Sequence, residues 1–129
     1  MFQDSAAFSS FAVDDLAAAK RFYGQTLGFP VTEHMDGAII DVTLPGGDHH
    51  VMVYPKDDFV PATYTVLNFP VRDVDAAVDE LTKQGIEMAR FEGFDQDARG
   101  IAHDGGGPAI AWFRDPAGNI LSVVEDVPA

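Results

Sequence analysis

The side chains best suited to acid–base chemistry are the histidines and one aspartate that interrupts an apolar run. Asp41 stands among apolar residues, His49 follows a turn sequence, and His103 lies beside a glycine-rich stretch. An imidazole gains or loses a proton near neutral pH, so His49 or His103 could act as a general base beside a carboxylate. The candidate catalytic residues are therefore His49, Asp41 and His103. The alternative for His49 is a solvent-exposed pair with His50, because both directly follow the turn.

Trp112 and Arg114 are the side chains best suited to holding a ligand. The indole ring offers a flat stacking surface, and its π face attracts a cation. Arg114 and Asp41 could pair with each other, or one of them could bind a ligand carboxylate or amine. The alternative is a structural ion pair at the edge of a sheet. The chain has no Cys, which excludes disulfides and a cysteine nucleophile.

These residues stand in a sequence that repeats itself. The stretch VDDLAAA at 13–19 returns as VRDVDAA at 71–77, an offset of 58 residues, and Pro45 aligns with Pro116 at an offset of 71. The second copy is longer because it carries a loop, Glu92–Gly107, which is expected to be either a lid or a disordered excursion. A duplicated chain builds two similar half-sites, so aligned positions in the two copies are expected to share one interior.

Hydrophobic periodicity gives each copy the order strand, helix and three strands. In the first copy, strands are expected near 7–13, 29–35, 38–44 and 49–55, and a helix capped by Asp14 or Asp15 runs to about Leu27. In the second copy, strands are expected near 64–71, 86–91, 108–114 and 119–125, and a helix capped by Asp73 runs to about Gln84.

Two such copies predict an α+β fold built from paired βαβββ modules. The modules are expected to form a curved, eight-stranded mixed sheet around a cavity, with one helix per module on the outer face. A chain of 129 residues suits a single domain, with module 1 at 5–55, a linker at 56–62 and module 2 at 63–126.

If Phe8 points into the cavity, the alternation of side chains along each strand sorts the other residues onto a helix-covered face and a cavity face. The predicted cavity face is mostly apolar with a few polar groups, which suits a small organic ligand. The predicted ligand-binding residues are Phe8, Ser10, Ile39, Asp41, His49, Val51, Val66, Asn68, Ile110, Trp112, Arg114 and Ser122.

Two stretches of the sequence carry a family resemblance. The first copy reads FAVDDL at 11–16, FY at 22–23 and LGF at 27–29, and the second copy reads WFRDPAGNIL at 112–121. Together they resemble the vicinal oxygen chelate superfamily, which includes glyoxalase I, extradiol dioxygenases, and fosfomycin and bleomycin resistance proteins. The resemblance spans nearly the whole chain and implies the paired-module fold, a scaffold that hosts many chemistries.

The resemblance also implies where a divalent metal lies in the metal-dependent members. Their ligands are His, Glu or Gln in the first and last strands of each module, and the matching positions here are Phe8, Val66, Val51 and Ser122. Apolar side chains offer no lone pair, and a lone serine hydroxyl is a poor ligand. No cofactor is therefore expected, and metal-dependent glyoxalase, dioxygenase or fosfomycin-modifying activity is disfavoured.

The charge balance favours one class of partner. The formal net charge of −13 argues against binding of nucleic acids or anionic membranes, which require a basic surface. An acidic field would concentrate cationic ligands, and the alternative is that the surface carboxylates only keep the protein soluble. The leading prediction is a metal-independent binding protein of the bleomycin-resistance type that sequesters a cationic or aromatic small molecule. One alternative is a lyase, isomerase or dioxygenase relative that uses His49, Asp41 or His103, with or without a metal. Another is an interaction module whose cavity is filled.

Two further expectations concern assembly and location. The resemblance implies a homodimer. The sequence opens without a basic-then-apolar leader, and no apolar run approaches the ~18 residues of a membrane span, so a cytoplasmic location is expected.

Overall fold

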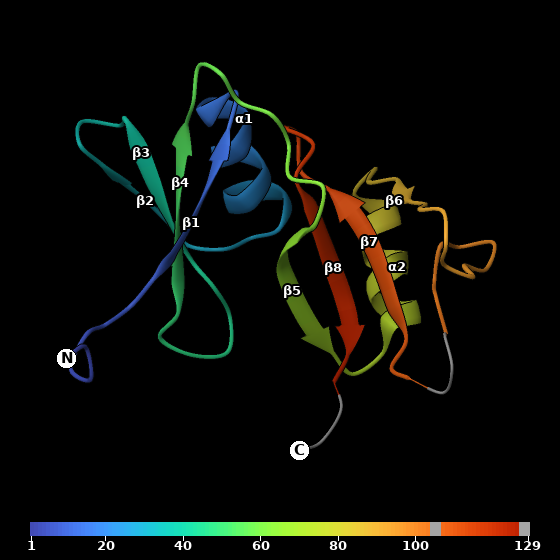
Figure 1. Ribbon diagram of the computed structural model, residues 1–129. Helices are drawn as coiled ribbons and strands as arrows, with labels where there is room; N and C mark the ends of the chain where they lie inside the picture. Colours follow the sequence, from blue (N-terminus) through green and yellow to red (C-terminus); the bar gives the residue numbers. More distant parts are fainter. Residues whose placement is uncertain (104–106, 127–129) are drawn as a thin grey trace. The chain divides into compact units, whose positions relative to one another are not determined.

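The computed structural model describes residues 1–103 and 107–126. The chain divides into two compact units, Met1–Pro61 and Ala62–Ala129, and the division falls inside the predicted linker. Each unit contains a strand, a helical segment and three further strands in that order (Figure 1). The repeat in the sequence is therefore a repeat of structure, and the predicted pair of βαβββ modules is confirmed.

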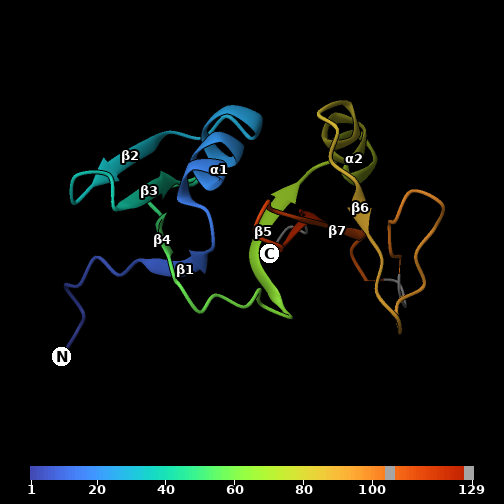
Figure 2. The ribbon, with the colours of Figure 1, turned by 90° about the horizontal axis from the view of Figure 1, so that it is seen from above.

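The first unit is a four-stranded sheet with a helical segment against one face (Figure 2). Its elements are β1 (Ser9–Val13), α1 (Leu16–Arg21), η1 (Phe22–Thr26), β2 (Val31–His34), β3 (Ile39–Thr43) and β4 (His50–Pro55). The strand order is β1-β4-β3-β2, with β1 parallel to β4 and the other neighbours antiparallel.

The second unit repeats this arrangement. Its elements are β5 (Thr65–Val71), α2 (Val74–Lys83), β6 (Met88–Ala89), β7 (Ile110–Arg114) and β8 (Ile120–Glu125). The strand order is β5-β8-β7-β6, with β5 parallel to β8 and the other neighbours antiparallel. The eight strands predicted for one mixed sheet thus form two mixed sheets of four.

Equivalent aspartates begin the two helices. The carboxylate of Asp15 accepts a hydrogen bond from the amide of Ala18, and that of Asp73 accepts one from Ala76, both at 3.1 Å. These bonds satisfy amides that have no partner in the first helical turn. The first helix continues as one wider π-helical turn, η1, and Gly28 follows it with a φ of 78°. Among the described residues, no helix is long and apolar enough to cross a membrane.

The helix-covered face of the first sheet is an apolar core. Strand register places Ile40 opposite Val53 and Val42 opposite Val51, and all four side chains are at most 1% exposed. Tyr23 from η1 is also fully buried. Burial of this face against the helical segment fixes which side of each strand is left for other contacts.

This register corrects two predicted cavity residues. The hairpin between β3 and β4 has six residues between the paired Thr43 and His50, whereas the second hairpin has five between Arg114 and Ile120. The offset between the units is therefore 71 residues for β3 and β7 but 70 for β4 and β8. Val51 belongs to the core face, and His49 lies in the turn before β4. A one-residue shift moves every side chain of a strand to the opposite face.

The long loop of the second unit is packed, at least through residue 103. Ala102 pairs with both Gln96 and Ile110 in isolated β-bridges, and Ile101 is fully buried. The Gln96 side chain donates to the carbonyls of Ala89 and Gly100 at 3.0 and 2.8 Å. The 92–103 segment is therefore not a disordered excursion. Its predicted continuation through 104–106 lies outside the described residues.

Candidate functional site

Each sheet has a second face that carries no helix of its own unit. We call these the first and second helix-free faces. Register assigns to the first face Ser10, Ala12, Ile39, Asp41, Thr43, His50, Met52 and Tyr54, with Phe8 two residues before Ser10. It assigns to the second face Asn68, Pro70, Ile110, Trp112, Arg114, Ile120, Ser122 and Val124.

A histidine and a carboxylate are paired on the first helix-free face. The Nδ1 atom of His50 lies 2.7 Å from Oδ1 of Asp41. The two residues stand on neighbouring strands, and Asp41 is a diagonal neighbour of His50 because its direct partner is Met52. Their side chains are 40% and 21% exposed, so the pair is reachable from solvent.

An aromatic ring lies over this pair. The rings of Phe8 and His50 are stacked, with centroids 5.5 Å apart and planes 12° from parallel. Phe8 is itself 54% exposed, so part of its ring is open to solvent. The first helix-free face thus brings together an aromatic ring, an imidazole and a carboxylate, and this is an arrangement that can contact an aromatic or cationic molecule.

On the second helix-free face, other residues of the protein cover the indole of Trp112, which was predicted to offer a stacking surface to a ligand. Trp112 is only 7% exposed and belongs to a small apolar cluster with Ala89, Ala102 and Ile120. Phe94 lies 4.8 Å from the Trp112 ring and Phe91 lies 5.6 Å from it, edge-on. The flat stacking surface predicted for Trp112 is therefore largely occupied by the protein itself.

The polar residues of the second face also have partners. The hydroxyl of Ser122 donates to Oδ1 of Asn68 at 2.6 Å, across the parallel pair of β5 and β8. The guanidinium of Arg114 lies over the Phe91 ring, 5.2 Å from its centroid. Asp41 is paired with His50 within its own unit. Arg114 therefore makes a cation–π contact with the residue just before the loop, and its predicted role in ligand binding stays a prediction.

The strand positions that hold a metal in related proteins do not fit one here. Phe8 and Val66 are apolar, and the lone hydroxyl of Ser122, which donates to Asn68, is a poor metal ligand. With the corrected offset, the fourth position is Met52 rather than Val51, and a thioether is a soft ligand that suits copper(I) better than hard divalent ions. Within residues 1–103 and 107–126 there is no group of three or more His, Cys, Asp or Glu side chains that could hold a metal.

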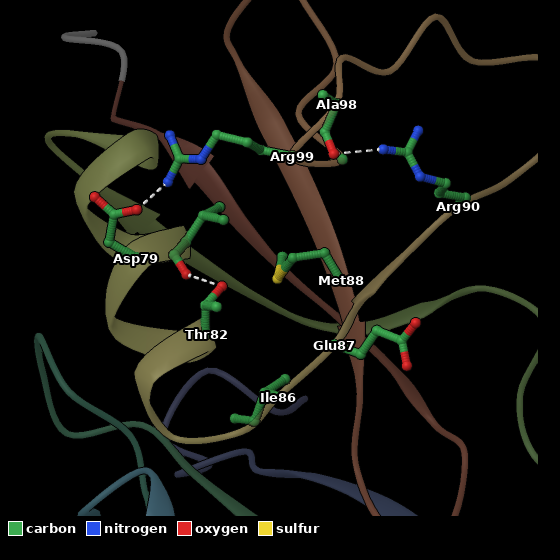
Figure 3. A pocket seen from close by; sticks show the side chains of 10 residues that line it. Asp79, Thr82, Ile86, Glu87, Met88, Arg90, Ala98 and Arg99 are labelled. Carbon is green, nitrogen blue, oxygen red and sulfur yellow. Dashed lines mark hydrogen bonds and ion pairs between the residues drawn. The ribbon is translucent and has the colours of Figure 1, made fainter.

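Two arginines fasten the 92–103 segment to the rest of the second unit. Arg99 donates to Oδ1 of Asp75 at 2.6 Å and also pairs with Asp79 on α2. Arg90 donates to the carbonyls of Asp97 and Ala98 at 2.7 and 2.8 Å. These contacts surround a pocket of about 410 Å³ between α2 and the segment (Figure 3). Because the guanidinium groups are used within the protein, we regard this pocket as structural.

Asp97 organises the turn that carries Arg99. Its Oδ1 atom accepts hydrogen bonds from the amides of Ile101 and Arg99 at 3.0 and 2.9 Å. The Ile101 amide is the main reason that the pKa of Asp97 lies below its ordinary value, and burial opposes the shift. His103, proposed from the sequence as a lid catalyst, lies 3.6 Å from Asp97 and is 62% exposed.

The sequence reasoning missed three residues of these faces. His50 was not assigned to this face because the offset of 71 residues, taken from the turn prolines Pro45 and Pro116, holds for β3 and β7 but not for β4 and β8. Phe91 and Phe94 lie in or beside an irregular loop. They carry no periodic signal that would have assigned them to a face.

The chain belongs to the Glyoxalase/Bleomycin resistance protein/Dioxygenase superfamily, whose family model matches residues 6–123. This confirms the resemblance on which the sequence prediction rested. No curated protein matches the chain.

Solved structures with this fold align over nearly the whole chain. A glyoxalase family protein from Enterococcus faecalis is 25% identical, has a TM-score of 0.65, and covers 97% of this chain and 100% of its own. A superfamily member from Sphaerobacter thermophilus is 27% identical with a TM-score of 0.67, covering 94% and 98%. An antibiotic binding protein from Streptomyces sp. CB03234 is 23% identical with a TM-score of 0.65, covering 95% and 97%, which is a likeness of fold alone.

Proposed function

We propose that this protein binds a small organic molecule, cationic and aromatic in character, without the help of a metal. The observation that carries the proposal is the group of Phe8, His50 and Asp41 on the first helix-free face. An exposed ring attracts the flat part and the charge of such a molecule, and the carboxylate attracts its positive group. On the first face, His50 and Met52 replace the predicted His49 and Val51, and the residues predicted on the second face stay predictions.

Two features of the whole chain support this class of ligand. The net charge of −13 attracts cations and repels anions at every approach. The fold is also shared with an antibiotic binding protein, so it is compatible with holding an organic guest. Independence from a metal is supported by the donor set, since Phe8, Val66, Met52 and Ser122 offer only one hydroxyl and one thioether between them.

A thermal-shift screen of cationic aromatic compounds tests the proposal. We expect at least one to raise the melting temperature of the wild type, and we expect Asp41→Asn to weaken its binding about tenfold by removing the charge that faces the ligand. Asp57→Asn is the matched control, because Asp57 is exposed on the linker and the substitution changes the net charge equally. Equal loss in both variants, or no compound that binds, would contradict the proposal.

A second candidate function is catalytic. The pairing of Asp41 with His50 favours His50 as the acid–base residue over His49 and His103. A carboxylate on Nδ1 orients an imidazole for proton transfer at its other nitrogen. Compounds that bind should then be converted, with product detected by mass spectrometry after prolonged incubation. Conversion that His50→Gln abolishes and His49→Gln preserves would establish an enzyme, whereas intact compound after incubation would leave binding as the function.

We also propose a cytoplasmic homodimer. Light scattering should give twice the 13.9 kDa mass of the chain, and a monomer across the concentration range would overturn this.

A further inference from the structure

We infer that the ring nitrogen Nε2 of His50 is the hydrogen-bond acceptor for the ligand, so that the site selects ammonium groups that carry N–H donors. This inference rests on the proposed function, because it specifies which cationic aromatic molecules that site takes. It is carried by the geometry of three neighbouring side chains on the first helix-free face.

The partner on Nδ1 fixes the tautomer of the imidazole. An ionised carboxylate only accepts hydrogen bonds, so the 2.7 Å contact requires a hydrogen on Nδ1 that points to Oδ1 of Asp41. In the neutral ring the lone pair then resides on Nε2. Nε2 has no hydrogen-bond partner among the described residues, and the side chain is 40% exposed. A bound molecule can therefore supply the missing donor.

Stacking with Phe8 fixes the orientation of the imidazole ring. The two rings are nearly parallel, 12° apart, and the Asp41 contact prevents rotation within the ring plane. A side chain held by two contacts loses less conformational freedom when a ligand arrives, and this improves affinity. The acceptor is thus prepared before binding.

Charge determines which donor suits this acceptor. A neutral hydroxyl or amide could donate to Nε2, but an ammonium group gains in addition from the neighbouring Asp41 carboxylate and Phe8 ring. A quaternary ammonium gains the same two attractions and cannot donate a hydrogen bond. A preference between ammonium groups of equal charge that depends on Nε2 therefore distinguishes the hydrogen bond from attraction between charges alone.

Phenethylammonium and its N,N,N-trimethyl derivative are the two probes, since they share the ring and the charge and differ in N–H donors. We expect the wild type to bind phenethylammonium about tenfold more tightly by calorimetry, as a hydrogen bond with a charged donor contributes roughly that much. His50→Phe keeps a ring that stacks on Phe8 and removes the acceptor, so it should bring the two affinities together. His50→Gln restores an acceptor and should recover part of the preference.

His49→Phe is the matched control, because it makes the same change one residue away in the exposed turn and should preserve the preference. Circular dichroism and melting curves check that each variant is folded. Equal affinities in the wild type, or a preference that survives His50→Phe, would overturn the inference while the proposed function stands. If neither probe nor any other cationic aromatic binds the wild type, the proposed function fails, and the inference fails with it.

Discussion

Several single carboxylates stabilise local structure in this molecule, and each does so by a hydrogen bond to a specific partner. Asp41 orients His50, Asp15 and Asp73 begin the helices, and Asp97 holds the turn of the 92–103 segment. The effect of losing one therefore depends on what it holds and not on its contribution to the net charge.

Asp97 should make stability depend on pH. Its pKa is lowered in the folded protein by the amides of Ile101 and Arg99, so it stabilises the fold fully above its ordinary pKa of 3.8. That contribution is lost as the pH falls through the lowered folded value, where the carboxylate takes up a proton. The melting temperature of the wild type should thus fall more steeply on acidification than that of Asp97→Asn.

Melting curves at neutral and acidic pH check this expectation. Asp57→Asn serves again as the control and should keep the wild-type dependence, because Asp57 is exposed on the linker. Parallel behaviour of Asp97→Asn and wild type would show that the amide contacts do not stabilise the folded state.

At the scale of elements, the 92–103 segment couples α2 to the cluster around Trp112. Arg99 fastens the segment to Asp75 and Asp79 on the helix, and Phe94 from the same segment covers the indole. Loss of the Arg99 contacts should therefore expose the Trp112 indole, because Phe94 of the same segment covers it.

Trp112 reports on this coupling because it is the one tryptophan of the chain. Arg99→Gln should raise the acrylamide quenching of its fluorescence and shift the emission to longer wavelength, since the indole is only 7% exposed in the native arrangement. Phe94→Ala should do the same directly. Arg72→Gln, at an exposed arginine just before the cap of α2, should leave both signals unchanged. Unaltered quenching in Arg99→Gln would show that Phe94 covers the indole without the help of the Arg99 ion pairs.

Some features of the helices and strands can be predicted from the sequence, and others cannot. The order of elements along each copy and the cap at Asp73 follow from local rules and were predicted, and Asp15 is one of the two caps proposed for the first helix. The face of β4 was not predicted correctly, because one additional turn residue reverses it and no local pattern distinguishes Val51 from Met52. The covering of Trp112 by Phe94 depends on long-range packing of an irregular loop. Alternation along a strand is a local signal, whereas turn length and loop packing are not.

At the scale of the whole molecule, the acidic surface should affect how ligands bind. The chain has twenty-one acidic and eight basic residues, so a cation is attracted at distances beyond the site itself. Raising the salt concentration should weaken the binding of phenethylammonium, because the screening length is about 10 Å at 0.1 M salt. Binding of the uncharged 2-phenylethanol should change little. Calorimetry across a salt series compares them, and equal dependence for both would contradict an electrostatic contribution.

Calorimetric titration of a cationic aromatic ligand into the protein, with and without a strong chelator, tests directly whether binding needs a metal. We expect the same Kd in both conditions and a Kd about tenfold weaker in Asp41→Asn, because the Phe8 ring, the His50 imidazole and the Asp41 carboxylate hold the ligand. Binding that disappears with the chelator and returns on addition of a divalent metal would contradict it.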